Sequence, residues 1–298
     1  MPSLRNNKQC WLLLLVLFAA AGLSAGVYLL ASAGQAGIGF PLDDAWIHQT
    51  YARNLTRDGE WAYTSGQPSG GSTSPLWTVI LAIGYLLGLS PFVWAFFIGS
   101  LLLGALAILV ERGVRLLLRE IRHKLPYAGL LIIFEFHFAW SAVSGMETLL
   151  HAVIIILISL ALMRKNPHWF LLGMLIGVST WIRPDGLTLL VPILLSGLFT
   201  GKGLRLKIQS TLWVMIGFII FFGPYLYFNY SLSGNIFPTT FYAKQNEYIT
   251  WQTGSLLKRS LDFLLIFLTG PAVLLLPAFL LESRKAIKDR NWTQVFLI

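Results

Sequence analysis

The chain has 298 residues, of which 56% are hydrophobic and 12% are charged, and its formal net charge is +9. A soluble domain carries about 25% charged residues, so this composition excludes an ordinary soluble protein and indicates lipid surroundings. On such a chain the positive charge predicts which loops face the cytoplasm, and we expect no nucleic-acid partner. The one cysteine, Cys10, excludes an intrachain disulfide.

Eight apolar runs are predicted to be membrane-spanning helices. In chain order they cover residues 11–33, 92–110, 126–144, 148–163, 169–182, 186–200, 211–232 and 261–281. Several are shorter than the ~20 residues that a straight span needs, so we expect flanking residues to complete them. The sequence therefore predicts an all-α membrane protein, a polytopic helical bundle of about eight spans that forms a single module over residues 1–298.

Both ends of the chain carry a further signal. The tripeptide Ala31-Ser32-Ala33 resembles a signal-peptidase site. The run from Trp11 is long enough for a full span, however, so we expect it to stay in the membrane. The last four residues, VFLI, begin another apolar run. We therefore expect the chain to be the front part of a longer membrane protein, truncated at its C-terminus.

A ninth apolar run, at 75–89, is only fifteen residues long, which is typical of an interfacial or re-entrant helix. If this run does not cross, the N-terminus is cytoplasmic and 16 of the 22 basic residues fall on cytoplasmic segments, as the positive-inside rule requires. If it crossed, the basic loop 111–124 would lie outside. We therefore expect a multi-pass protein of the plasma (inner) membrane, with outer loops at 34–74 and 233–260.

Two adjacent carboxylates, Asp43 and Asp44, open a helix-like segment in the first outer loop, PLDDAWIHQTYARNL. On a helix, Asp44 shares one face with His48 and Tyr51. One aspartate is accounted for as a helix N-cap, which leaves the other available. The second carboxylate suits either a general base or a ligand for a divalent cation, and the residues leave these alternatives open.

Two short turns place further charges at the ends of predicted spans. Glu147 in SGMETLL lies at the tip of a tight turn between two apolar runs, as a site residue or as a solvated turn residue. Arg183 in WIRPDG ends a span on the outer side, against the general charge trend. It is expected either to bind a phosphate or to reach lipid headgroups while paired with Asp185.

Three other segments deserve an interpretation. The stretch GNIFPTTFYAKQ, with Tyr242 and Lys244, is either an interfacial aromatic belt or part of a phosphate site. The loop GQPSGGSTSPLW is predicted to be a flexible turn leading into the interfacial helix, and it lacks the pattern of a phosphate-binding loop. Glu135, close to His137 in FEFHF, is the ionisable residue predicted to lie within a span.

Five motifs, in the order DDAWIHQTYARNL, GSTSPLW, SGMET, RPDG and FPTTFYAK, cover about residues 38–245. Together they resemble the C-type (GT-C, multi-spanning) glycosyltransferases that use polyprenyl-phosphate sugars, and most of all the branch that includes the mycobacterial terminal arabinofuranosyltransferases. That branch shows a D-D-A-[YW]-I opening, a G-x-[TS]-[NS]-x-L-W loop, an S-G-x-E-T turn, a T-R-P-[DE]-G turn and a P-x-x-[FY]-Y-A-K stretch. One departure is Trp181-Ile182-Arg183, where the family commonly has Leu-Thr-Arg.

The resemblance implies an inverting glycosyltransferase that moves a sugar from a polyprenyl-phosphate donor to a glycan, lipid or protein acceptor on the outer face. Asp43 would be the catalytic base and Asp44 its partner. The residues that would bind substrate are His48, Glu147, Arg183, Tyr242 and Lys244. No cofactor is required by this scheme, although Mg²⁺ or Mn²⁺ held by the two aspartates remains open. The rival classes are a transporter or flippase of an anionic lipid-linked sugar, and a structural scaffold.

Overall fold

The computed structural model describes residues 7–117, 125–200, 203–247, 254–269, 273, 276–289, 291–292 and 295. These residues form helices joined by short connections and a small antiparallel hairpin, so the prediction of an all-α protein is confirmed. The chain divides into two compact units: Met1–Leu160 with Ser179–Pro184, and Ala161–Val178 with Asp185–Ile298. Each unit is described by itself.

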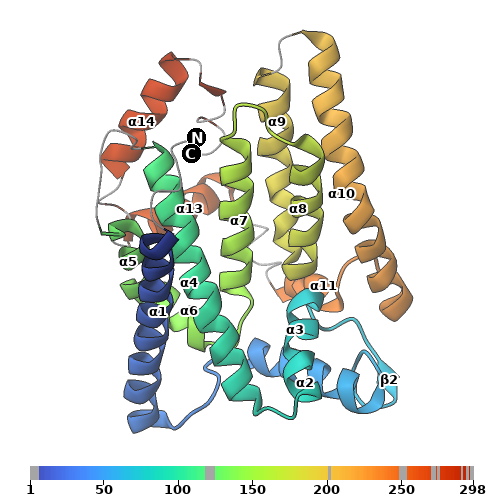
Figure 1. The fold of residues 1–298 in the computed structure, drawn as a ribbon. Helices are drawn as coiled ribbons and strands as arrows, with labels where there is room; N and C mark the ends of the chain where they lie inside the picture. The colour runs from blue at the N-terminus through green and yellow to red at the C-terminus, as the bar shows by residue number, and fades with distance from the viewer. Residues whose placement is uncertain are drawn as a thin grey trace. The chain divides into compact units, whose positions relative to one another are not determined.

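The helices of the first unit surround a core of leucine, alanine and aromatic side chains. Its elements are α1 (Asn7–Ala36), α2 (Asp43–Asp58), β1 (Ala62–Thr64), β2 (Gln67–Pro68), α3 (Pro75–Leu86), α4 (Pro91–Leu117), α5 (Tyr127–Phe134), α6 (Phe136–Val143) and most of α7 (Thr148–Leu162). Helices α1 and α4 lie side by side, and α5 and α6 pack against both (Figure 1). Helix α2, the hairpin and α3 gather at the end where α1 stops and α4 begins (Figure 1).

Small residues allow α4 to approach its neighbours closely. A Cβ on Gly99 would collide with the carbonyl oxygen of Ala142 in α6, and one on Gly104 would collide with the ring of Phe18 in α1. Close backbone approach of this kind is typical of helix packing in membranes, where dispersion contacts replace the hydrophobic effect.

The first outer loop is more regular than its composition indicates. Helix α2 begins at Asp43, so it includes both aspartates, one of which was predicted to be the N-cap. It ends at Asp58, and the C-cap Gly59 adopts a left-handed conformation with φ +71°. Asn54, buried in α2, donates hydrogen bonds from Nδ2 to the carbonyls of Ala62 (3.0 Å) and Tyr63 (2.9 Å). These bonds fasten the hairpin to α2. Helix α3 is the short helix predicted at 75–89, and Pro75 occupies its first turn.

The predicted continuous helix over 126–144 is wrong, because α5 and α6 are separate helices of eight residues each. Glu135 between them has extended backbone, and its side chain accepts a hydrogen bond from the amide of Phe138 at 3.1 Å. A carboxylate that satisfies the orphan amides of a helix start favours a new N-terminus at that point. One glutamate in an apolar run therefore ends one helix and begins the next.

The second unit holds most of α8 (Trp169–Ile182), the 3-10 helix η1 (Pro184–Leu189), α9 (Leu190–Thr200), α10 (Leu204–Ser233), α11 (Thr239–Glu247), α13 (Leu256–Thr269) and α14 (Leu276–Lys288). Helix α9 packs on α10. Helices α8 and α10 meet through glycines, since a Cβ on Gly173 would collide with the carbonyl of Val214 and one on Gly217 with the carbonyl of Phe170.

The count of about eight spans is not confirmed. Among the described residues, three helices are long and apolar enough to cross a membrane: Leu13–Gly34, Pro91–Leu117 and Leu204–Ser233. The predicted span at 186–200 starts with a 3-10 turn, and α9 adds only eleven residues. Of the predicted span at 261–281, the two ends lie in α13 (Leu256–Thr269) and α14 (Leu276–Lys288), and most residues between these helices lie outside the described part.

Candidate functional site

The paired aspartates occupy the first two positions of α2. The N-cap residue is Leu42, which has no capping side chain, and Asp43 Oδ1 instead accepts a hydrogen bond from the amide of Asp44 at 2.9 Å. Asp43 is exposed and Asp44 is half-buried. Neither aspartate is therefore the N-cap itself, but both carboxylates lie at the positive end of the α2 dipole. The carboxylate of Asp43 is accessible to a solute.

One turn after Asp44, His48 points into the unit and is 2% exposed. Its Nδ1 lies 3.1 Å from Ser72 Oγ, and Ser72 Oγ lies 3.0 Å from Thr78 Oγ1 in the first turn of α3. Buried polar groups of this kind need partners, and these three side chains supply partners to one another. The chain of contacts orients the imidazole.

This finding corrects the prediction that GQPSGGSTSPLW is simply a flexible turn. Ser72, Ser74 and Thr78 are all buried, because the loop runs between α2 and α3, which pack on each other. Ser72 and Thr78 were not predicted as site residues. The signal that would have found Ser72 is the motif GSTSPLW, in which hydroxyl side chains accompany a buried tryptophan, and Thr78 directly follows that motif.

Glu147 joins three distant parts of the sequence. It lies between α6 and α7, is 2% exposed, and accepts a hydrogen bond at Oε1 from Nη1 of Arg183 at 3.0 Å. Its Oε2 lies 3.4 Å from His48 Nε2, a distance at which the two groups form an ion pair when the imidazole is protonated, although they lack the alignment of a hydrogen bond. The alternative of a solvated turn residue is thereby excluded, and the structure pairs Arg183 with Glu147.

Electrostatics keeps the Glu147 carboxylate ionised. Burial raises the pKa of Glu147, but His48, a backbone amide and Arg183 together outweigh burial and hold that pKa below its usual value. The anion anchors Arg183, whose side chain remains 37% exposed. A guanidinium that is oriented by a buried carboxylate and is partly exposed suits an anionic ligand such as phosphate.

The turn that carries Glu147 is shaped by two aromatic residues. Gly145 has φ +77°, and a Cβ at this position would collide with the ring of Phe40. The indole of Trp77 donates a hydrogen bond to the carbonyl of Gly145 at 2.9 Å. Two of the sequence motifs, GSTSPLW and SGMET, are therefore in direct contact, and glycine is required at position 145 by both conformation and space.

The predicted site residues fall into two groups. His48, Glu147 and Arg183 are in contact, and Asp43 and Asp44 begin the helix that carries His48. The remaining two, Tyr242 and Lys244, lie on α11 in the second unit. Their part in the site stays a prediction.

The donor set for a divalent cation is limited to two carboxylates. Among the residues that the structure describes, no three His, Cys, Asp or Glu side chains are grouped to hold a metal ion. Asp43 and Asp44 are the residues that would offer carboxylate oxygens to Mg²⁺ or Mn²⁺, with water or phosphate oxygens needed for the rest of the coordination.

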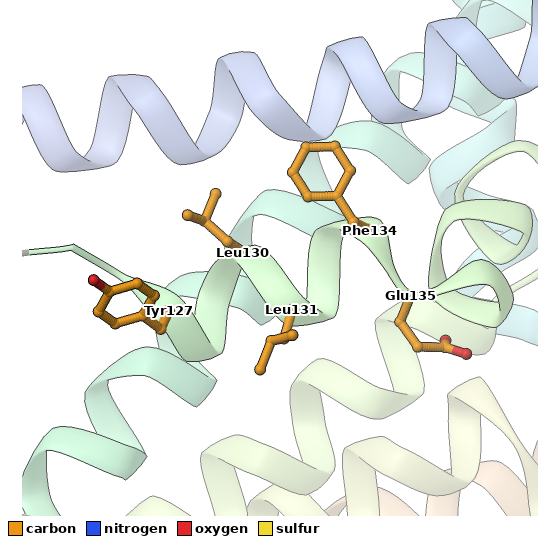
Figure 2. A pocket seen from close by; sticks show the side chains of 5 residues that line it. All are labelled: Tyr127, Leu130, Leu131, Phe134 and Glu135. Atoms are coloured by element: carbon orange, nitrogen blue, oxygen red, sulfur yellow. The ribbon is translucent and has the colours of Figure 1, made fainter. Parts of the chain in front are cut away.

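A hollow of about 440 Å³ runs along α5, away from these residues in the sequence. It is lined by Tyr127, Leu130, Leu131, Phe134 and Glu135 (Figure 2). In Figure 2, Phe134 points toward α1, and Glu135 lies where α5 ends. The Glu135 Oε1 lies 2.7 Å from Nδ1 of His137. The lining is mostly apolar, and none of the predicted catalytic or substrate-binding residues contributes to it.

The fold and site together define an all-α protein with membrane-spanning candidates, a buried His48–Glu147 pair in contact with Arg183, and two aspartates at the start of the helix that carries His48. No family model, curated protein or solved structure matches the chain.

Proposed function

We propose that the protein is a membrane glycosyltransferase that moves a sugar from a polyprenyl-phosphate donor to an acceptor on the outer face of the plasma membrane, with inversion. The observation that supports this most strongly is the contact of His48, Glu147 and Arg183. These residues come from three separate motifs of the resemblance. Their contact in space gives a physical reason for the three motifs to occur together in one chain.

In the proposed reaction, Asp43 removes a proton from an acceptor hydroxyl while the oxygen attacks the anomeric carbon of the donor. The bond from that carbon to the phosphate oxygen breaks, and its electron pair leaves with the polyprenyl phosphate. Arg183, oriented by Glu147, stabilises the charge that develops on the phosphate. For Tyr242 and Lys244, on α11 of the second unit, donor binding is proposed from the motif resemblance alone.

The membrane arrangement belongs to the same proposal. We propose about eight spans with the N-terminus in the cytoplasm, and α2, the hairpin and α3 on the outer face. The distribution of basic residues supports this orientation. A tail in the bilayer and a phosphate headgroup at its surface would then both be within reach of a site at the ends of helices.

The proposal is tested by transfer of radiolabelled sugar from a panel of polyprenyl-phosphate donors in membranes with matched expression. Asp43→Asn should lower transfer by about 10²–10⁴-fold and leave membrane insertion intact, because the general base is lost. Asp58→Asn, at the other end of α2, is the matched control and should keep its activity. Transfer at wild-type rates by Asp43→Asn would remove this residue as the base.

A second candidate is a transporter or flippase of an anionic lipid-linked sugar. The observation that favours it is the Glu135–His137 contact at the break between α5 and α6, beside the 440 Å³ hollow. Ionisable pairs at interrupted helices are typical of ion-coupled transport. Glu135→Gln should then abolish flipping in proteoliposomes. Flipping by the wild type, without transfer from any donor, would favour this candidate over the first.

A further inference from the structure

A second hollow in the first unit, with a volume of about 190 Å³, lies where α1 ends and the chain turns toward α2. Its walls include Tyr28 and Ser32 from α1, Phe40 and Pro41 from the connection, and Trp140 from α6. The floor is formed by buried side chains such as Phe40, whereas Ser32 and Pro41 at the mouth are exposed. The hollow is therefore open on the side of Ser32 and Pro41.

The lining combines flat apolar surfaces with hydrogen-bonding groups. Tyr28, Phe40 and Trp140 present aromatic rings. The hydroxyl of Tyr28, the hydroxyl of Ser32 and the indole N–H of Trp140 have no hydrogen-bond partner among the described residues. A sugar ring has the matching surface, because its C–H faces pack on aromatic rings while its hydroxyls exchange hydrogen bonds around the edge.

The size of the hollow limits the ligand. Pockets for drug-sized ligands have about 300–1,000 Å³, so 190 Å³ is suited to a single ring. A lipid tail is a poor match, because the hydroxyls and the indole N–H would lose their hydration without gaining partners. The hollow along α5 has the contrasting character, since its lining is almost entirely apolar.

The hollow is adjacent to the candidate site through Phe40. This ring packs against Gly145 so closely that a Cβ on the glycine would collide with it, and Gly145 lies two residues before Glu147. Pro41, at the mouth of the hollow, lies two residues before Asp43 in the sequence. A ring held in the hollow would therefore lie next to the start of α2.

We propose that this hollow is a binding site for one sugar ring, formed by Tyr28, Ser32, Phe40 and Trp140. Its part in catalysis rests on the proposed glycosyltransferase function, in which the ring belongs either to the donor or to the acceptor. Sugar binding itself is a property of the hollow and is measurable without any transfer reaction.

The test is binding of methyl glycosides of glucose, mannose, galactose and arabinose to the full chain in phosphatidylcholine nanodiscs, followed by saturation-transfer NMR. Nanodiscs are required because sugar-based detergents would compete for the site. At least one glycoside should bind saturably. Ser32→Phe fills the mouth from an exposed helix position and should abolish binding. Ala31→Phe adds the same bulk one residue away and should bind like the wild type.

A second variant tests the aromatic wall. Trp140→Ala should weaken binding at least about tenfold, whereas Trp11→Phe at the opposite end of α1 should leave it unchanged. Binding of no glycoside, or equal binding by Ser32→Phe and Ala31→Phe, would overturn the proposed site.

Transfer kinetics identify the source of the ring. A higher KM for the acceptor in Ser32→Phe, with unchanged hydrolysis of the donor, assigns the ring to the acceptor, and slower donor hydrolysis assigns it to the donor. A wild type that binds glycosides but transfers no sugar would overturn the proposed function and leave the sugar site standing. Transfer by Ser32→Phe at the wild-type rate would overturn the sugar site and leave the proposed function standing.

Discussion

Glu147 is the residue on which the candidate site depends. It is buried, it contacts both His48 and Arg183, and its neighbours keep its pKa low despite burial. Because Glu147 itself is inaccessible, we interpret it as a positioning residue that directs Arg183. The resemblance implied that Glu147 shapes the site or holds the donor phosphate, and its buried contacts with His48 and Arg183 favour the first of these roles.

Replacing Glu147 with glutamine should destabilise the protein and do so in a pH-dependent way. Loss of a charge-assisted hydrogen bond costs about 1.5–3 kcal/mol. A carboxylate whose pKa is lowered by folding stabilises the protein above its unfolded pKa, about 4.3, and that stability is lost as pH falls through the folded pKa. Melting temperatures of wild type and Glu147→Gln should thus differ near pH 7 and converge below about pH 4. A difference that grows in acid would contradict this account.

Gly145 is the residue that holds the turn of Glu147 in place. Both Gly145 and Gly59 have positive φ, but a Cβ at Gly145 would collide with Phe40, whereas a Cβ at Gly59 meets nothing within 4 Å. Gly59→Ala should cost about 1–2 kcal/mol for the left-handed conformation alone. Gly145→Ala should lower the free energy of unfolding by more, because the methyl group also collides with Phe40. Thermal melts of the two variants would separate the cost of the left-handed conformation from the cost of the collision. Equal losses would mean that Phe40 moves aside without cost.

At the scale of elements, single carboxylates decide where helices begin. Glu135 starts α6, and Glu111 of α4 reaches across to the start of α5, where its Oε2 accepts from the amides of Ala128 (3.1 Å) and Gly129 (3.3 Å). Glu111 is 4% exposed and also pairs with Arg115. The predicted 126–144 span is thus divided into two helices, and a glutamate carboxylate accepts hydrogen bonds from the backbone amides at the start of each one.

Glu111→Ala should therefore loosen the start of α5. Removing an acceptor from orphan amides at a helix N-terminus costs about 1–2 kcal/mol. Amide hydrogen exchange, measured by mass spectrometry on peptides covering 127–134, should become faster in Glu111→Ala. The control is Arg112→Ala, an exposed neighbour on the same helix. Equal exchange in both variants would mean that the cap does not stabilise α5.

At the scale of the whole molecule, the orientation in the membrane is testable with single cysteines on a Cys10→Ser background. Gln67→Cys lies in the exposed hairpin, and Arg164→Cys lies in the exposed connection between α7 and α8. The charge distribution predicts opposite sides. An impermeant maleimide should label Gln67→Cys in intact cells and Arg164→Cys only after permeabilisation. Labelling of both from the same side would overturn the proposed topology.

Local signals predicted a substantial part of the fold. The start of α2 at Asp43 and of α3 at Pro75 follow from residues that favour the first turn of a helix. The interruption at Glu135 was not predicted, because an apolar run has the same composition whether or not its one carboxylate caps a helix. Hydropathy also does not report the type of helix: the predicted span at 186–200 is helical throughout but begins as the 3-10 helix η1. The middle of the predicted span at 261–281 lies outside the described residues.

The sequence by itself determined the helical, membrane-type composition and the identity of five motifs, because these are properties of neighbouring residues. The tertiary structure decided which of the motif residues meet. It brought Glu147 to His48 and Arg183, placed Phe40 against Gly145, and buried Ser72 in a loop that its composition indicated to be flexible. These contacts join residues far apart in the chain, and their geometry depends on how α2, α3 and the α6–α7 turn pack, which no local pattern specifies.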